Sequence, residues 1–188
     1  MNISTFRAGF KGTRSNRFII TPGAGPVAVP GVEAFKLYAK ATSFPGSAIG
    51  MIPVSYQGRV VKYSGERQFA EWSIQVYDSS VSGGAGGVNI RQYFENWMTL
   101  GDHPLTHKQQ YNIASTGAWK IEFDDITGTA GGDTTTYKKP FNLFSCWPID
   151  ISAIDLNYEA ADSFAEFTLT LAYDFHQKSS SITGTGTA

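Results

Sequence analysis

The fold of this chain is decided by residues 40–72, which read KATSFPGSAIGMIPVSYQGRVVKYSGERQFAEW. A Pro-Gly turn lies near the start of this segment, and Ser64-Gly65 predicts the bend of a hairpin whose arms are residues 53–63 and 66–77. Strands typically have about 5–6 residues, so arms of 11 and 12 residues predict an unusually long hairpin. At about 3.3 Å per residue the first arm spans about 36 Å, and we expect its tip to project beyond the body of the domain.

The predicted hairpin carries apolar side chains that are unfavourable to leave in water, among them Val60, Val61, Tyr63 and Phe69. A bare two-stranded ribbon is also only marginally stable in water. The hairpin therefore either docks on a neighbouring subunit or folds back over its own sheet. The periodicity of the sequence is compatible with both.

Alternation of apolar and polar residues predicts that much of the remaining chain is strand. In residues 70–76 the even positions are apolar, and Glu71, Ser73 and Gln75 lie between them, so one side of this strand faces a core. Further strands are expected at 17–20, 34–41, 119–123, 141–147, 151–158 and 165–175. Together these segments predict a β body of roughly eight strands.

One segment has helical spacing instead. Its apolar residues recur at i, i+3, i+4, i+7 and i+8, and they are Ile90, Tyr93, Phe94, Trp97 and Met98. Asn89 is suited to the N-cap, and Gly101 is suited to the C-terminal end. The sequence therefore predicts one amphipathic helix packed on the β body.

Length and composition indicate a single soluble domain. The 188 residues suffice for one hydrophobic core. We expect an N-terminal arm at 1–16, a core at about 17–175 and a mobile polar tail at 177–188, with glycine-rich loops at 81–88 and 127–136. No apolar run reaches the roughly 20 residues of a membrane span, and the N-terminus lacks the apolar block of a signal peptide.

The charge balance argues against a surface that attracts nucleic acid or an acidic membrane. Lys and Arg number 15 against 16 Asp and Glu, which gives a net charge of −1. Charged residues make up 16% of the chain, against roughly 25% in ordinary soluble domains, while aromatic residues reach 14%. This composition predicts that contacts with other subunits cover much of the surface.

Residue types that support catalysis or metal binding are present but not in productive patterns. His103 and His107 have the spacing of two zinc ligands on a helix, yet Pro104 lies between them, so a loop with two solvated histidines is expected. Asp124 and Asp125 adjoin a Gly/Thr loop, but adjacent carboxylates on a strand point to opposite faces. The glycines at 83–87 are not followed by the Lys-Ser or Lys-Thr pair of a phosphate loop. We therefore expect no enzymatic activity, no cofactor and no metal.

Cysteine and tryptophan side chains are expected in the core. Cys146 lies in the apolar run 144–147, where it reads as a small core residue. The four tryptophans are Trp72, Trp97, Trp119 and Trp147. Exposed tryptophans would favour a carbohydrate-binding sandwich, but all four lie on apolar faces or in apolar runs, which favours core packing.

Three segments of the chain resemble the tail tube proteins of contractile-tailed bacteriophages, a family similar in fold to the tube subunits of type VI secretion and related injection machines. They are residues 40–78, the helix NIRQYFENWM at 89–98, and CWPIDISAIDLNYEAADSFAEFTLTLAYDF at 146–175. In the first segment, several residues fall in the same order as in the family. They are Pro45, residues 52–54, Arg59, Gly65, Arg67, Phe69 and Trp72. The resemblance implies a mainly β fold, a small β-barrel or two-sheet sandwich with one amphipathic α-helix and a long protruding hairpin.

The resemblance also implies a structural role in a virion. Hexameric rings would stack into a hollow tube in contact with sheath and baseplate proteins, double-stranded DNA would pass through the lumen without specific binding, and assembly would occur in the cytoplasm of the host bacterium. The expected contacts between rings and subunits are Pro53, Val54, Tyr56, Arg59, Val60, Val61, Tyr63, Arg67 and Phe69. Candidate acids facing the lumen are Glu122, Asp124, Glu166 and Asp174. The alternatives are a tube subunit of a type VI or phage-derived injection system and a β-sandwich carbohydrate-binding module.

Overall fold

The structure is a computed structural model that describes residue 3 and residues 13–26, 38–79, 89–125, 141–157 and 164–178. Its strands are β1 (Thr13–Thr21), β2 (Ala39–Thr42), β3 (Ser47–Tyr56), β4 (Arg59–Phe69), β5 (Trp72–Tyr77), β6 (Trp119–Asp125), β7 (Phe141–Phe144), β8 (Trp147–Ile151), β9 (Glu166–Ala172) and β10 (Phe175–Lys178), and its helix is α3 (Ile90–Gly101). The predicted mainly β fold is confirmed. Residues 34–37, both glycine-rich segments and residues 179–188 lie outside the described part.

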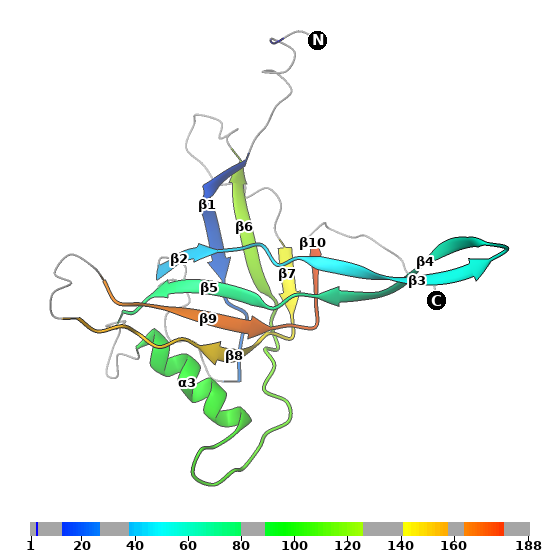
Figure 1. Ribbon diagram of the computed structural model, residues 1–188. Helices are drawn as coiled ribbons and strands as arrows, with labels where there is room; N and C mark the ends of the chain where they lie inside the picture. Colours follow the sequence, from blue (N-terminus) through cyan, green and yellow to red (C-terminus); the bar gives the residue numbers. More distant parts are fainter. Residues whose placement is uncertain are drawn as a thin grey trace.

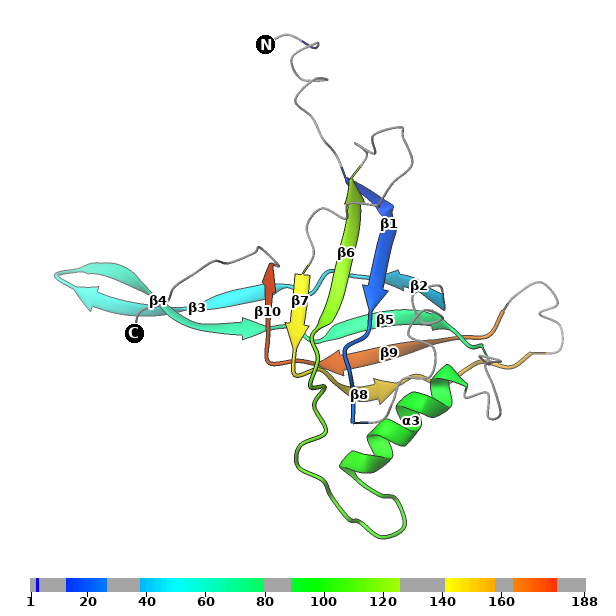
Figure 2. The same ribbon diagram turned by 180° about the vertical axis from the view of Figure 1, so that it is seen from behind.

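Two antiparallel four-stranded sheets form the body, and a third pair of strands leaves it (Figure 1). The first sheet has the order β1-β6-β7-β10, the second has the order β2-β5-β9-β8, and β3 pairs only with β4. Figures 1 and 2 show the strands of the two sheets running across one another, with the β3–β4 hairpin extending away from them. The described strands do not close into a barrel, so the sandwich is the correct one of the two predicted architectures.

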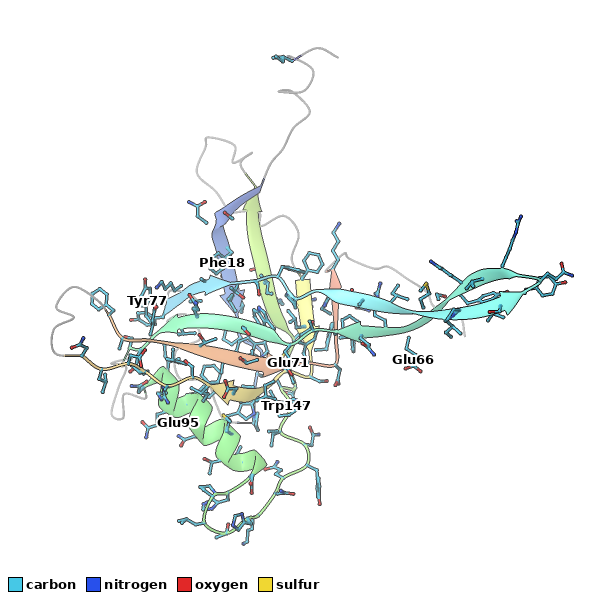
Figure 3. The ribbon with its side chains drawn as sticks, in the orientation of Figure 1. Phe18, Glu66, Glu71, Tyr77, Glu95 and Trp147 are labelled. Carbon is cyan, nitrogen blue, oxygen red and sulfur yellow. The ribbon has the colours of Figure 1, made fainter. Side chains whose placement is uncertain are left out.

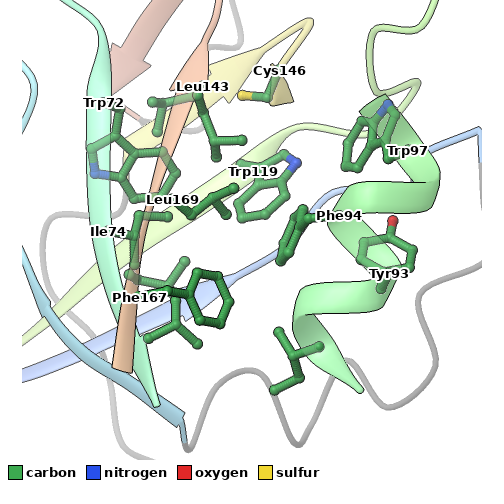
Figure 4. Packing of buried hydrophobic residues seen from close by; sticks show 14 of the residues in the cluster. Trp72, Ile74, Tyr93, Phe94, Trp97, Trp119, Leu143, Cys146, Phe167 and Leu169 are labelled. Atoms are coloured by element: carbon green, nitrogen blue, oxygen red, sulfur yellow. The ribbon is translucent and has the colours of Figure 1, made fainter. Parts of the chain in front are cut away.

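The core lies between the facing sides of the two sheets (Figure 4). The first sheet contributes Ile20, Trp119, Ile121 and Leu143, and the second contributes Trp72, Ile74, Val76, Phe167, Leu169 and Leu171. Trp72 and Trp119 meet edge to face across the two sheets, with ring centroids 5.9 Å apart. The core-facing positions predicted from alternation are therefore confirmed along β5 and β9 and at the start of β6.

Helix α3 covers the edge of the second sheet along β8. The predicted N-cap is confirmed, because Asn89 Oδ1 accepts a hydrogen bond of 2.8 Å from the Arg91 amide. Ile90, Tyr93, Phe94 and Trp97 are buried, and burial raises the pKa of the Tyr93 phenol. No helix in the described ranges combines the length and the apolar character needed to cross a membrane.

Two predicted strands have wrong bounds because the chain changes sheet within them. The expected strand at 141–147 is interrupted by Ser145, whose φ is +58°, and the chain leaves β7 in the first sheet to begin β8 in the second. The expected strand at 165–175 is likewise divided at Tyr173 and Asp174, after which β10 joins the first sheet. The expected strand at 151–158 is also wrong, since β8 ends at Ile151. Both sheets face one core, so unbroken alternation does not reveal a change of sheet.

Cys146 is fully buried, as predicted, and burial raises the pKa of its thiol from 9.0 to about 12. Since the thiolate is the reactive form, we expect the folded protein near pH 8 to react with Ellman's reagent at least about a hundredfold more slowly than the chain in concentrated urea. The unfolded chain loses this proton near pH 9 and the folded chain near pH 12, so the stability linked to this group is complete below pH 9 and declines above it. Equal reaction rates in native buffer and in urea would contradict the prediction.

Candidate protein-docking site

The β3–β4 hairpin turns at Gln57 and Gly58, and its strands are paired from Ser47 with Phe69 to Tyr56 with Arg59. Gln57 and Gly58 have φ values of +46° and +77°. Two central residues with positive φ are typical of the type I′ turn, whose twist matches that of the strands it joins. The bend predicted at Ser64-Gly65 is therefore wrong, because the Gln-Gly pair makes the two-residue turn.

The Ser64-Gly65 pair instead marks a β-bulge. Ile49 pairs with Arg67 and Met51 pairs with Ser64, so β4 has one more residue than β3 over this interval. A Cβ on Gly65 would lie 3.1 Å from the Gly50 carbonyl, so glycine permits the close approach of the two backbones here. A bulge increases local twist, and Figure 1 shows the two strands crossing in this region. Beyond it, residues 51–64 form what we call the distal ribbon.

The distal ribbon has two unlike faces because residues paired across an antiparallel ladder point to the same side. The pairs Ile52 with Tyr63, Val54 with Val61, and Tyr56 with Arg59 form one side, which we call the apolar face. The other side is mixed, with Met51, Pro53 and Val60 among Ser55, Lys62 and Ser64, and its Met51 and Val60 are also exposed. Ile52 is not among the contact residues predicted individually from the sequence. Pairing the arms about Gln57-Gly58 would have placed it opposite Tyr63.

The apolar face of the distal ribbon is exposed to solvent in the single chain. Its five apolar side chains, Ile52, Val54, Tyr56, Val61 and Tyr63, are between 42% and 64% exposed. Within the described ranges β3 and β4 pack extensively only on each other, and the ribbon projects from the body in both views (Figures 1 and 2). The alternative that the hairpin folds back over its own sheet is therefore wrong. Contiguous exposed apolar surface of this kind marks a site of contact with another protein.

Two of the predicted contact residues lie at the base of the hairpin instead. The half-buried Phe69 ring lies 5.0 Å from the ring of His176 and 6.1 Å from that of Tyr173, both in the body. The Arg67 guanidinium lies 5.9 Å from the centre of the Phe69 ring. Burial, together with the Arg67 charge, lowers the pKa of His176. Phe69 thus joins the hairpin to its own body, and Arg67 packs on that contact.

The structure does not bring the four candidate lumen acids together. Glu166 lies on the solvent side of the second sheet, where it pairs with Lys40. Glu122 lies on β6 of the first sheet, and Asp174 lies in the turn between β9 and β10. The side chain of Asp124 lies outside the described part. If the lumen wall is one face of one sheet, that wall therefore does not contain all four candidate acids.

Trp147 is exposed, which corrects its predicted place in the core. Its side chain is 36% exposed, whereas the other three tryptophans are fully buried. Trp147 borders a pocket of about 340 Å³ together with Tyr111, Ile113 and other residues of the loop after α3.

The loop after α3 also contains His103. Its Nδ1 accepts hydrogen bonds from the backbone amides of Leu105 and Thr106, each at 3.3 Å, so this histidine stabilises the turn.

A β-sandwich that carries a long ribbon of exposed apolar side chains defines a structural subunit that works through contacts with other chains. The chain belongs to the phage tail tube protein family, whose model matches residues 16–179. It is 23% identical over 143 residues to the tail tube protein gp19 of Enterobacteria phage T4, and this match covers 76% of this chain and 81% of the T4 protein. The gp19 protein of Enterobacteria phage T6 is 22% identical over the same shares of the two chains.

Solved structures from injection systems share the fold. A chain of the anti-feeding prophage baseplate matches with a TM-score of 0.61 at 9% identity, covering 90% of this chain and 96% of that one. A chain of the PVC sheath–tube complex in the extended state matches with a TM-score of 0.55 at 14% identity, covering 95% and 99%. The resemblance seen in the sequence is confirmed, and this chain is a structural tube subunit of the kind found in contractile phages and related injection systems.

Proposed function

We propose that this chain assembles into hexameric rings that stack into a hollow tube, and that the apolar face of the distal ribbon makes contacts between rings. The observation that supports this proposal is that the apolar face is exposed and that the ribbon extends beyond the body of its own subunit. Full burial of a Val or Ile side chain contributes about 1.5–3 kcal/mol, so burying the rest of this apolar face offers a substantial driving force for docking. The similar chains belong to a sixfold-symmetrised baseplate and to a sheath–tube complex, which supports sheath and baseplate proteins as the partners.

The contacts within each ring would come from the edges of the sheets. In the described topology the second sheet ends in β2 and β8, of which β8 is covered by α3, and the first ends in β1 and β10, so β1, β2 and β10 are the edges proposed for pairing. Edge strands carry unpaired backbone donors and acceptors that pair readily with another chain. Pairing them around a closed ring satisfies these groups and leaves the hairpins free for contacts along the tube axis.

We assign the tube lumen to the solvent side of the second sheet and its cargo to double-stranded DNA. That side presents small polar pairs such as Ser73 with Thr170 and Gln75 with Thr168. Within the described residues, the cationic side chain on this side of the sheet is Lys40, and it forms an ion pair with Glu166. Since duplex binding grows with each cation placed against a phosphate, a wall without unpaired cations lets DNA pass without holding it. Glu166 is then the one of the four candidate acids that we retain for the lumen.

The role is structural, and we propose a place in the virion tail, assembly in the host cytoplasm and no catalytic activity. Negative-stain electron microscopy of the purified chain over a concentration series tests the assembly. We expect uniform hollow tubes or stacked rings whose end-on views are sixfold. Particles that remain monomeric at every concentration, even when preformed tubes or baseplates are added as seeds, would overturn the proposal. A tube subunit of a phage-derived injection system is the second candidate. It has the same fold, and its cargo would be protein.

A further inference from the structure

A stack of identical rings requires two different surfaces on each subunit. Head-to-tail contacts are heterologous, so the surface that one ring presents must match another surface on the next ring. On the proposed function, the distal ribbon is the first of these surfaces. The second surface is then expected on the body, away from the ribbon.

The end of the second sheet farthest from the ribbon is the natural position for the matching surface. β5 leads away from the hairpin and ends at Tyr77, which pairs with Glu166 at the start of β9. Figure 3 shows Tyr77 on the side of the body opposite the hairpin, which carries Glu66 and extends beyond it. The Ser152 amide, just after β8, donates to the Thr168 carbonyl at 2.9 Å, so the residues that follow run toward the same end as Tyr77.

Large apolar side chains are exposed at this end. Phe164 is 85% exposed and Leu156 is 88% exposed. The Phe164 ring meets the half-buried Tyr77 ring edge to face, with centroids 6.4 Å apart. We call Tyr77, Asp155, Leu156 and Phe164 the far-end patch. Its apolar side chains are chemically matched to the apolar face of the ribbon.

The charges at the two ends are also complementary. The distal ribbon contains Arg59 and Lys62 and no acidic residue. At the far end the cations Lys40 and Arg91 are paired with Glu166 and Glu95. Asp78 and Asp155 have no such pairing within the described ranges, and Asp78 Oδ1 is buried there without a hydrogen-bond partner. A cationic ribbon and an anionic patch favour contact between unlike ends over contact between like ends.

We propose that the far-end patch receives the distal ribbon of a second copy of this chain in the adjacent ring. Ile52, Val54, Val61 and the two ribbon tyrosines then cover Phe164 and Leu156, and Arg59, which is on the same face, lies toward Asp155 and Asp78. The ribbon projects from one end of the second sheet and the patch lies at the other end, so each added ring presents a fresh copy of the surface that the next ring needs. The contact therefore propagates along one axis.

The test uses two full-length variants that each lack one of the two surfaces. Val54→Asp with Val61→Asp disables the ribbon, and Leu156→Asp with Phe164→Asp disables the patch. We expect each variant alone to raise the lowest concentration that gives tubes by at least about tenfold, with far-UV circular dichroism and melting temperature unchanged. Mixed together, the two variants retain one intact ribbon and one intact patch. They should form pairs of rings by electron microscopy and sedimentation, but no long tubes.

The matched control is Leu105→Asp with Tyr111→Asp, which adds the same charges at two equally exposed apolar residues elsewhere, 86% and 97% exposed. Tubes should form normally. Tube loss in this control, long tubes from the patch variant, or a mixture that fails to pair would each overturn the assignment of the patch. If only the ribbon variant is blocked, the proposed function survives without this patch. If the ribbon variant builds tubes as well, the proposed function fails too.

Discussion

Replacing residues 52–63 by an Asn-Gly turn is expected to leave a folded subunit that builds no tubes. Met51 and Ser64 are paired across the hairpin, so a two-residue turn can join them without changing the register below. None of the buried core residues lies in the removed segment, so the sandwich retains its packing. The variant loses all five apolar side chains of the docking face. We expect its critical concentration for tube formation to rise by more than about a hundredfold.

Electron microscopy and sedimentation over a concentration series measure this effect, with circular dichroism and thermal unfolding as evidence of folding. The matched control is Ser55→Asp with Ser64→Asp, which places two charges on the opposite side of the same ribbon. We expect this control to weaken assembly less than Val54→Asp with Val61→Asp does. Long tubes from the truncated subunit would show that the ribbon is not needed for stacking.

Trp72→Ala is expected to lower the free energy of unfolding by about 3–5 kcal/mol. The Trp72 side chain is fully buried, stands edge to face on Trp119, and donates through Nε1 to Thr42 Oγ1 at 2.7 Å. Its removal leaves a cavity where the two sheets meet and leaves the Thr42 hydroxyl without that donor. Urea unfolding followed by circular dichroism, at concentrations that keep the chain monomeric, measures the loss.

The control for this prediction is the exposed tryptophan. Trp147→Ala removes the same side chain from a position that is 36% exposed, so the expected loss is smaller, roughly 1–2 kcal/mol. Equal losses for the two variants would contradict the division between a buried core and a solvated Trp147. A small loss for Trp72→Ala would show that the sheets can close around the vacated space.

Sequence periodicity predicted well those features that depend on one segment at a time. The inward faces of β5 and β9, the helix with its Asn89 cap, and the burial of Cys146 all follow from residues close together in the chain. The existence of a long hairpin was likewise visible in residues 40–72. Its bend was misplaced because Ser64-Gly65 and Gln57-Gly58 are both two-residue turn signals. Only the strand pairing distinguishes the turn from the bulge.

The candidate site was predicted in part for the same reason. The residues of the distal ribbon were recognised as apolar, but their division into two faces depends on which residues are paired across β3 and β4. Phe69 was predicted as a contact with a neighbouring subunit, but it packs on Tyr173 and His176, which lie more than a hundred positions later in the chain. Contacts between residues so far apart in the chain do not produce a periodic pattern in the sequence.

By itself, then, the sequence determined the fold class, the core-facing positions, the single amphipathic helix and membership of the tail tube family. The tertiary structure alone decided where the chain passes from one sheet to the other, which tryptophan remains exposed, how the acids are distributed over two sheets, and which side of the ribbon is apolar. The physical reason is that alternation records only whether a side chain faces a core. Register and sheet membership depend on hydrogen bonds and packing between residues far apart in the chain.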